Sequence, residues 1–323
     1  MSWQNKAEGY AQIDLLGAAK RPFLFIISYD QEQILAQPLE SLDEDILYDI
    51  EGLHKHPNPQ AKTPSPLYKH PLPYHRYKAS FDKIIQEIQK GNTYLLNLTF
   101  ATPIQTDDSL KHIFDNANAK YKLCYKDSFV CFSPECFVEI DDGILSTYPM
   151  KGTIDASIPH AKEIILADTK EMAEHTMIVD LMRNDLSIIA QNVKVEKFRY
   201  VEEIAAGDTS LLQVSSKITA TLSTDWQSKI GTLLCQILPA GSITGAPKKR
   251  TMEIIQEVED FDRGFYTGVF GIYDGKTLRS AVMIRFIEKH EEKLIYKSGG
   301  GITLDSIDTK EYKELIDKIY LPF

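Results

Sequence analysis

Apolar residues recur along most of the chain with the two spacings that distinguish helices from strands. One helical set, spaced by three or four positions, is Phe81, Ile84, Ile85 and Ile88. Gly91 and Asn92 come three and four positions after Ile88 and predict where the helix ends. Residues 93–100 then alternate between apolar and polar side chains, which predicts a strand with two different faces.

The same two spacings predict mixed strands and helices over the rest of the chain. Three short strands are expected between residues 129 and 147, with a hairpin turn at Asp141, Asp142 and Gly143. Helices are predicted at 159–167, 170–182, 226–236, 246–259 and 308–320. Further strands are predicted at 193–204, 209–221, 266–273, 277–287 and 293–298. Hairpins interleaved with helices indicate an α+β fold with large, mostly antiparallel sheets.

The first 75 residues differ from this pattern. Residues 1–55 read as a short N-terminal segment, with one strand at 22–28 and an acidic amphipathic helix at 39–50. Residues 56–75 read as an extended connector, because six prolines within them remove amide donors and fix φ. The histidines in and around the connector are interpreted as solvated rather than metal-bound. The main domain is therefore expected to be 76–323.

Composition and charge exclude several classes of protein. Hydrophobic residues make up 43% of the chain and charged residues 25%, which is ordinary for a globular protein. The formal net charge of −10 disfavours nucleic acid as a partner, and an anionic substrate would need a local cation. No apolar stretch approaches the roughly 18 residues of a membrane span. Without a signal-peptide layout, and with four cysteines that form no CxxC pair, the chain is expected to be cytoplasmic with reduced thiols.

Two predicted helices carry the same pair of carboxylates. Glu171 and Glu174 are three residues apart and share one helix face, and Glu311 and Glu314 repeat this arrangement. Each pair alone could be a solvated first turn that complements the helix dipole. Together, four carboxylates could hold Mg²⁺, which takes one or two carboxylates directly and retains water. Spacing alone leaves both interpretations open.

Glycine-rich segments offer backbone amides to an anion. Gly299, Gly300 and Gly301 follow a predicted strand and precede the second acidic helix. Without side chains their amides can approach an anion closely, although a tight turn would also use glycines. Residues 239–249 form a predicted loop that opens a helix, with Pro247 at the first helical position, and suit anion capture in the same way.

Lys151 and Glu135 stand on neighbouring predicted strands, sixteen residues apart. They could face one another as nucleophile and acid, but Lys151 could equally be a surface charge. Only about 0.04% of a lysine with the reference pKa near 10.4 is neutral at pH 7. A nucleophilic Lys151 therefore requires surroundings that lower its pKa.

Six motifs in a fixed order carry a family resemblance. They are SPECF (133–137), YPMKGT (148–153), DTKEMAEHTMIVDLMRNDL (168–186), PAGSITGAPKKRTMEII (239–255), GFYTGVFG (264–271) and SGGGITLDS…EYKEL (298–315). Together they resemble the chorismate-utilising enzymes, and most closely the aminodeoxychorismate synthases among them. The resemblance begins near residue 76 and implies a two-sheet antiparallel sandwich flanked by helices, with 76–323 as the chorismate-binding catalytic domain.

The resemblance implies a metal and a set of substrate contacts. Mg²⁺ would be held directly by Glu174 and Glu311, and through water by Glu171 and Glu314, and would grip the ring carboxylate of chorismate. The implied substrate-binding residues are Thr244, Gly245, Tyr266, Arg285, Gly299, Gly300, Gly301 and Lys318. Among these, Arg285 lies in an apolar predicted strand, where an unpaired charge is costly, so either a bound anion or a partner carboxylate is expected beside it.

Lys151 separates the branches of the family. Anthranilate synthases resemble the whole sequence but normally carry Ala at this position. In aminodeoxychorismate synthases the lysine is proposed to attack ring carbon C2 while Glu135 protonates the departing C4 hydroxyl. Ammonia then adds at C4 to give 4-amino-4-deoxychorismate. Isochorismate and salicylate synthases also keep the lysine, but as a base for water.

The implied activity is therefore the chorismate-aminating subunit for p-aminobenzoate and folate biosynthesis, supplied with ammonia by a separate glutamine amidotransferase. Anthranilate synthase component I is the first alternative, and isochorismate or salicylate synthase the next. Relatives usually carry a histidine in the strand at 210–216, where this chain has none. A catalytically silent binding paralogue is thus the alternative from a different class.

Overall fold

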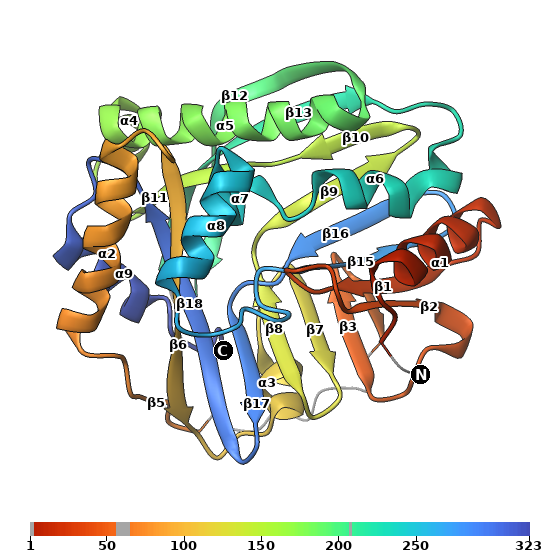
Figure 1. Cartoon of the computed structure of the whole chain (residues 1–323), viewed down its shortest axis with the longest axis horizontal. Helices are drawn as coiled ribbons and strands as arrows, with labels where there is room; N and C mark the ends of the chain where they lie inside the picture. The colour runs from red at the N-terminus through yellow and green to blue at the C-terminus, as the bar shows by residue number, and fades with distance from the viewer. Residues whose placement is uncertain (1–2, 56–64, 207–208) are drawn as a thin grey trace.

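Two large antiparallel sheets form the centre of the molecule (Figure 1). The computed structural model describes residues 3–55, 65–206 and 209–323. Within these residues the first sheet contains, in spatial order, β11 (Met150–Asp155), β13 (Thr209–Thr221), β10 (Ile144–Thr147), β9 (Cys136–Asp141), β16 (Leu278–Val282), β15 (Val269–Tyr273), β1 (Phe23–Ile27) and β2 (Ile34–Pro38). An additional strand, β12 (Gln191–Ala206), pairs with β13.

The second sheet is also antiparallel. Its strands are, in spatial order, β14 (Gly245–Ala246), β6 (Leu95–Gln105), β18 (Lys293–Ile302), β17 (Phe286–His290), β8 (Phe129–Ser133), β7 (Tyr121–Tyr125), β3 (Ile46–Ile50) and β4 (Leu53–Lys55), and β5 (Tyr68–Lys69) pairs with β6. The predicted α+β class with mostly antiparallel sheets is therefore confirmed.

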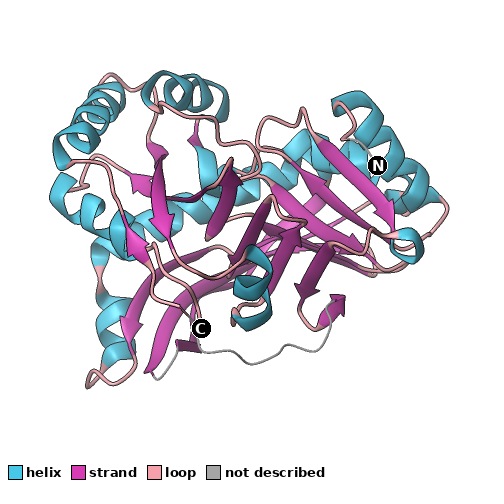
Figure 2. Ribbon diagram, turned by 90° about the horizontal axis from the view of Figure 1, so that it is seen from below, coloured by secondary structure: helices cyan, strands magenta, loops and turns pink. Residues whose placement is uncertain are grey.

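Helices flank the two sheets, as Figure 2 shows. They are α1 (Lys6–Ala18), α2 (Tyr74–Gln89), α3 (Leu110–Asn116), α4 (Ala161–Ala167), α5 (Thr169–Ile189), α6 (Ile230–Ile237), α7 (Gly241–Thr244), α8 (Lys248–Val258) and α9 (Asp308–Asp317). Helix α5 packs on β11, β12 and β13 of the first sheet, and α2, α8 and α9 pack near β6 and β18 of the second. The two acidic pairs predicted from the sequence thus lie on helices over different sheets, one on α5 and one on α9.

Strand β1 illustrates how the apolar layers arise. Leu24 and Ile26 are buried between the two sheets, whereas Phe23, Phe25 and Ile27 are buried against the helices on the other face. Successive side chains of a strand point to opposite faces, so a strand covered on both sides needs an unbroken apolar run. Burying each such side chain stabilises the fold by about 1.5–3 kcal/mol.

The helix predicted at 39–50 is wrong. The segment forms a short 3₁₀ turn, Leu39–Ser41, and then strand β3, which pairs with β7 on one side and β4 on the other. Ile46 and Ile50 are buried, and β3 gains backbone hydrogen bonds from partners more than 70 positions away, which a local spacing cannot reveal. Helix α1 was not predicted; Asn5 begins it by accepting a hydrogen bond from the Glu8 amide.

The strand predicted at 277–287 is two strands in different sheets. β16 ends at Val282 in the first sheet, and β17 begins at Phe286 in the second. Arg285 stands at this crossing with a φ of +52°, a left-handed backbone conformation, instead of inside an apolar strand. Gly299, Gly300 and Gly301 also differ from expectation, because they lie within β18, opposite Thr99, Leu98 and Asn97, and do not follow a strand.

The N-terminal segment contributes strands to both sheets, through β1 and β2 in the first and β3 and β4 in the second. Of the expected connector 56–75, residues 56–64 lie outside the described residues, and the remainder contains β5 and the start of α2. The domain boundaries themselves stay predictions. Among the described helices, none combines the length and the apolar character needed to cross a membrane. All four cysteines are free thiols, and three of them are buried.

Candidate active site

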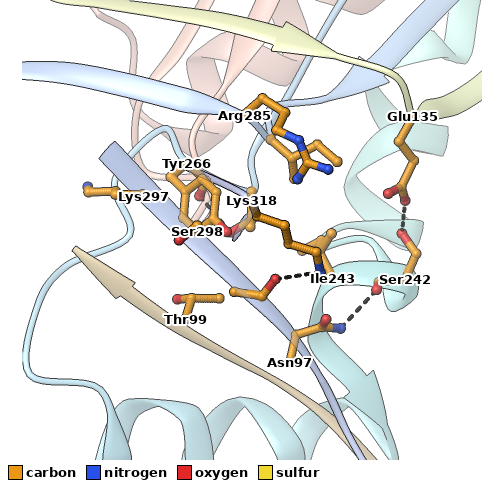
Figure 3. Close-up of a pocket in the computed structure, with 13 residues that line it drawn as sticks. Asn97, Thr99, Glu135, Ser242, Ile243, Tyr266, Arg285, Lys297, Ser298 and Lys318 are labelled. Carbon is orange, nitrogen blue, oxygen red and sulfur yellow. Dashed lines mark hydrogen bonds between the residues drawn. The ribbon is translucent and has the colours of Figure 1, made fainter. Parts of the chain in front are cut away.

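A cavity of about 110 Å³ lies among segments that are far apart in the chain (Figure 3). Its walls come from β6, β18, the loop around α7, the turn before β15, the crossing at Arg285, and the end of α9. Five of the residues predicted for the site line it, namely Glu135, Tyr266, Arg285, Gly299 and Lys318. The fold thus brings together catalytic and substrate-binding candidates from three of the motifs, with Arg285 and Lys318 from outside them.

Glu135 reaches the cavity from the short link between β8 and β9. The Ser242 hydroxyl donates a hydrogen bond of 2.6 Å to its Oε1 atom. Burial raises the pKa of Glu135 above its usual range, although Ser242 and the charges of Arg285 and Lys318 lower it in part. A carboxyl group whose pKa is raised by burial keeps its proton to higher pH, which suits a general acid.

Arg285 and Lys318 give the cavity positive charge. The Arg285 side chain packs over the Tyr320 ring, with its guanidinium carbon 5.3 Å from the ring centre, and its Nε donates to the Tyr320 hydroxyl at 3.3 Å. Lys318 donates to the Gly299 carbonyl at 2.9 Å and forms an ion pair of 2.6 Å with Glu314. Burial lowers the pKa of Lys318 overall, although Glu314 opposes this. Both cations can therefore meet an anion in the cavity.

The glycines of β18 permit close packing beside this charge. A Cβ on Gly299 would lie 2.4 Å from the Leu98 carbonyl oxygen, so no other residue fits there without movement. A Cβ on Gly300 would lie 3.5 Å from both Glu314 Oε1 and Lys318 Nζ, which places this glycine next to the charged groups of α9. Gly301 pairs with Asn97 further along the strand. Binding of substrate by the glycine amides stays a prediction.

Thr244 and Gly245 stand behind the cavity wall rather than on it. The Thr244 hydroxyl is fully buried and donates to the Ala240 carbonyl at 2.9 Å. Gly245 pairs with Leu96 at a φ of +131°, and a Cβ there would lie 1.9 Å from the Leu95 carbonyl oxygen. Their neighbours Ser242 and Ile243 line the cavity instead. Pro247 is the residue before α8, not its first residue.

Several cavity residues were missed by the sequence analysis. They are Asn97, Thr99, Ser242, Ile243, Thr267, Ile284, Lys297 and Ser298. Asn97 donates to the Ser242 carbonyl at 2.9 Å and so fixes the loop that supports Glu135. The motif 239–255 contains Ser242, but its contact with Glu135 depends on a chain crossing that no local pattern reveals.

Lys151 lies next to the four glutamates, which we call the acidic cluster (Glu171, Glu174, Glu311 and Glu314). Its Nζ atom is 2.9 Å from Glu174 Oε2, and its side chain is 31% exposed. Burial lowers the pKa of Lys151, but Glu174, Glu314 and Glu171 outweigh this and raise it overall. This is the opposite of the lowered pKa that a nucleophilic lysine requires. Glu135 and Lys151 are not on adjoining strands, since β13 and β10 stand between β11 and β9.

The acidic cluster adjoins the cavity without lining it. Lys318, which lines the cavity, is paired with Glu314 of the cluster. Burial raises the pKa of Glu171, and burial together with the charge of Glu314 raises the pKa of Glu311. In both groups burial outweighs the nearby charges of Lys151 and Lys170, which lower the pKa.

The donor chemistry of the acidic cluster suits Mg²⁺, because carboxylate oxygens are the ligands this ion prefers. The relief of repulsion among the glutamates would favour any cation that entered. Within the described parts of the chain, however, no three His, Cys, Asp or Glu side chains are grouped closely enough to hold an ion. The positive charge beside Glu174 is supplied instead by Lys151 and, at 3.6 Å, by Lys170.

His175, next to Glu174, was not assigned a role from the sequence. Its ring is fully buried, and its Nε2 atom lies 2.6 Å from the Ser216 hydroxyl of β13. Burial lowers the pKa of His175 to about 4. A neutral His175 therefore fastens α5 to the first sheet. In β13, residues 211–213 are half-buried, and nothing gives Gln213 a chemical role.

The sequence pattern of the chorismate binding enzymes matches residues 14–322. The chain belongs to this family. This chorismate-binding enzyme is 49% identical over 317 residues to a PabA-like protein of Haemophilus influenzae, with 96% of this chain and 95% of that protein covered. It is 30% identical over 259 residues to aminodeoxychorismate synthase component 1 of Bacillus subtilis, covering 76% of this chain and 54% of the synthase.

Similarity to a solved structure agrees with the family. Anthranilate synthase component I from Streptococcus pneumoniae superposes with a TM-score of 0.65 and 26% sequence identity, covering 80% of this chain and 59% of that one. The chorismate-binding enzyme spans little more than half the length of the Bacillus subtilis and Streptococcus pneumoniae synthases. The predicted two-sheet sandwich of the family is thus confirmed.

Proposed function

We propose that this chorismate-binding enzyme is the aminating subunit of an aminodeoxychorismate synthase, which converts chorismate and ammonia to 4-amino-4-deoxychorismate. The observation that carries the proposal is the position of Lys151. Its amine is held within the acidic cluster beside Glu174, not turned out into bulk solvent. An anthranilate synthase needs no amine there, whereas a covalent route to amination at C4 does.

The charges around the cavity support a dianionic substrate. Arg285 and Lys318 face the cavity, and Tyr266 adds a buried phenol to the same wall. Hydrogen bonds from charged donors to a carboxylate are the strong ones, and the planar Arg285 fork can donate two in parallel. The pyruvyl carboxylate of chorismate is the group that we assign to these residues.

Glu135 and Lys151 divide the chemistry between them. In the first step the Lys151 amine, once it has released its proton to solvent, forms a bond to ring carbon C2. Both ring double bonds shift, and the C4 hydroxyl leaves with the Glu135 proton as water. In the second step ammonia bonds to C4, both double bonds shift back, and the C2–nitrogen bond breaks to restore the Lys151 amine. The new C4 ammonium then returns a proton to the Glu135 carboxylate. Two easier displacements replace one difficult displacement. Proton donation by a positioned acid such as Glu135 typically accelerates a reaction 10²–10⁴-fold.

Mg²⁺ completes the proposed site. Glu174 and Glu311 would bind it directly, with Glu171 and Glu314 acting through water. When bound, the ion supplies positive charge for the ring carboxylate of the substrate, which an acidic chain must otherwise repel. The protein groups provide the rest: Arg285 and Lys318 orient the substrate, Glu135 donates the proton, and Lys151 supplies the amine.

Ammonia would come from a separate glutamine amidotransferase subunit in the cytoplasm, and free ammonium salts would replace it in the test tube. The free cysteines are those expected in a reducing compartment. The product would serve p-aminobenzoate and folate synthesis after a separate lyase removes pyruvate.

The decisive experiment identifies the product. Purified chain is incubated with chorismate, ammonium chloride and MgCl₂, and the products are separated by chromatography. Aminodeoxychorismate is the expected product, and adding a lyase should convert it to p-aminobenzoate. Anthranilate with pyruvate, or isochorismate, would overturn the proposal, and so would tight chorismate binding with no turnover.

A further inference from the structure

One cation of the protein itself already stands in the acidic cluster. Lys151 Nζ is 2.9 Å from Glu174 Oε2, close enough for a hydrogen-bonded ion pair. Glu174 is only 12% exposed, so water screens this pair less than a surface pair. The Lys151 charge also acts on Glu171, Glu311 and Glu314, and Lys170 acts on the first two of these as well.

We propose that Lys151 and a divalent cation exchange at Glu174. In this exchange the ion takes the carboxylate only as the lysine leaves it, so that metal binding is the event that frees the amine. The proposal rests on the proposed function, because it concerns the same lysine and the same four glutamates. It adds an order of events within that site.

Lys151 and a divalent ion cannot both stay at Glu174, because two cations at one carboxylate repel each other. A magnesium ion bound to Glu174 would lie about 2 Å from a carboxylate oxygen. An ammonium still bonded to that carboxylate would then be only a few ångströms from a doubly charged ion, where repulsion in a partly buried site is strong. Lys151 is able to leave, because its charge sits on a flexible four-carbon stem and its side chain is 31% exposed.

The present arrangement of the carboxylates agrees with an exchange in which the lysine leaves as the ion binds. In the described residues no three His, Cys, Asp or Glu side chains form a ready metal site, while Lys151 is paired with Glu174 and attracted by the charges of Glu171 and Glu314. The cluster is therefore arranged around the ammonium and closes on an ion only after exchange. The ion pair and metal binding are linked equilibria. A change that makes the Lys151–Glu174 pair more stable by a given factor therefore lowers the affinity for the metal ion by the same factor.

Calorimetry tests the exchange without any substrate. MgCl₂ is titrated into metal-free full-length chain and into the Lys151→Met variant, and thermal melting checks that the variant is folded. Lys151→Met is expected to bind Mg²⁺ about tenfold more tightly, because Glu174 no longer has to be released. Unchanged or weaker binding in this variant overturns the exchange.

Lys170→Met is the matched control. Lys170 approaches the other oxygen of Glu174 at 3.6 Å, and its side chain is 46% exposed. Its removal deletes the same charge near the same carboxylate, but breaks only a long and solvated pair. We expect the affinity for Mg²⁺ to change by less than about threefold. An equal gain in Mg²⁺ affinity in both variants would mean that removing any nearby positive charge favours the ion. That result would overturn the exchange.

A second measurement uses the unaltered chain. Lysines are modified with formaldehyde and cyanoborohydride, with and without MgCl₂ at constant ionic strength, and each site is quantified by peptide mass spectrometry. Modification of Lys151 is expected to rise severalfold with Mg²⁺, while that of Lys170 changes little. No rise, or protection of Lys151, overturns the exchange. Neither measurement depends on the identity of the chorismate product, so this proposal and the proposed function can fail separately.

Discussion

Ser242 and Glu135 are 107 residues apart in the chain and are joined by a hydrogen bond of 2.6 Å between the Ser242 hydroxyl and Glu135 Oε1 (Figure 3). Ser242 belongs to α7, and Glu135 to the link between β8 and β9. Asn97 holds the Ser242 carbonyl from β6, so three segments meet at this carboxyl group. The bond orients Glu135 toward the cavity and also adjusts its proton affinity.

Replacing Ser242 by alanine should move the pH dependence of turnover upward. The Ser242 hydrogen bond favours ionised Glu135 and lowers its pKa, which burial raises. Without this bond the pKa rises further, Glu135 stays protonated to higher pH, and the alkaline limb of the kcat profile shifts to higher pH. Ser298→Ala is the control, since Ser298 also lines the cavity but donates to the Leu315 carbonyl. A limb that stays in place in Ser242→Ala would contradict this role.

Glu135→Gln should lower kcat far more than it changes KM. Glutamine keeps the size of the side chain and can still accept from Ser242, but it has no proton to donate. Loss of a general acid typically costs 10²–10⁴-fold in rate. Steady-state kinetics with chorismate at saturating ammonium measures the separate effects on kcat and KM. A kcat within threefold of the unaltered enzyme would remove Glu135 from proton transfer.

Arg285→Lys should weaken chorismate binding even though the charge is kept. A lysine cannot reproduce the two parallel donors of the guanidinium or its packing on Tyr320. Losing one charged hydrogen bond costs about 2 kcal/mol, or roughly thirtyfold in kcat/KM. Arg279→Lys provides the comparison, because Arg279 pairs with Glu51 away from the cavity. Equal kcat/KM values in both variants would argue against a substrate contact by Arg285.

Arg263→Met should destabilise the fold through a buried ion pair. Arg263 and Glu259 are each 2% exposed and lie 2.6 Å apart, and Arg263 also donates to the carbonyls of Ile243 and Asn97. Removing the cation leaves a buried carboxylate unpaired, which costs about 3–5 kcal/mol in the free energy of unfolding. Urea denaturation followed by circular dichroism measures this loss.

A surface pair serves as the reference for that measurement. Lys229 and Asp225 lie 2.6 Å apart, but both side chains are at least half exposed. Lys229→Met should therefore cost less than about 1 kcal/mol. If Arg263→Met costs no more than Lys229→Met, the buried pair does not support the loop beside the cavity.

Local spacing was enough to predict most elements after residue 76. The strands at 129–147, the hairpin turn at Asp142 and Gly143, and the helices near 161–167 and 308–317 all appear in the structure. These predictions succeed because the periodic spacing of apolar residues that distinguishes helices from strands depends only on residues close together in the sequence. In the N-terminal segment the same reasoning fails at residues 39–50, where pairing with β7 overrides a helix-like pattern.

The sequence by itself determined the family motifs, the acidic pairs and the candidate lysine and glutamate, since each depends on residue type at a short spacing. Only the tertiary structure decided that the chain crosses between sheets at Arg285, that Gly299 lies within a strand, and that Ser242 meets Glu135. It also decided that Lys151 pairs with Glu174 and is separated from Glu135 by two strands. The physical reason is that a local pattern specifies which face of an element is buried, whereas the partner that covers this face is chosen by packing and hydrogen bonds across the whole chain.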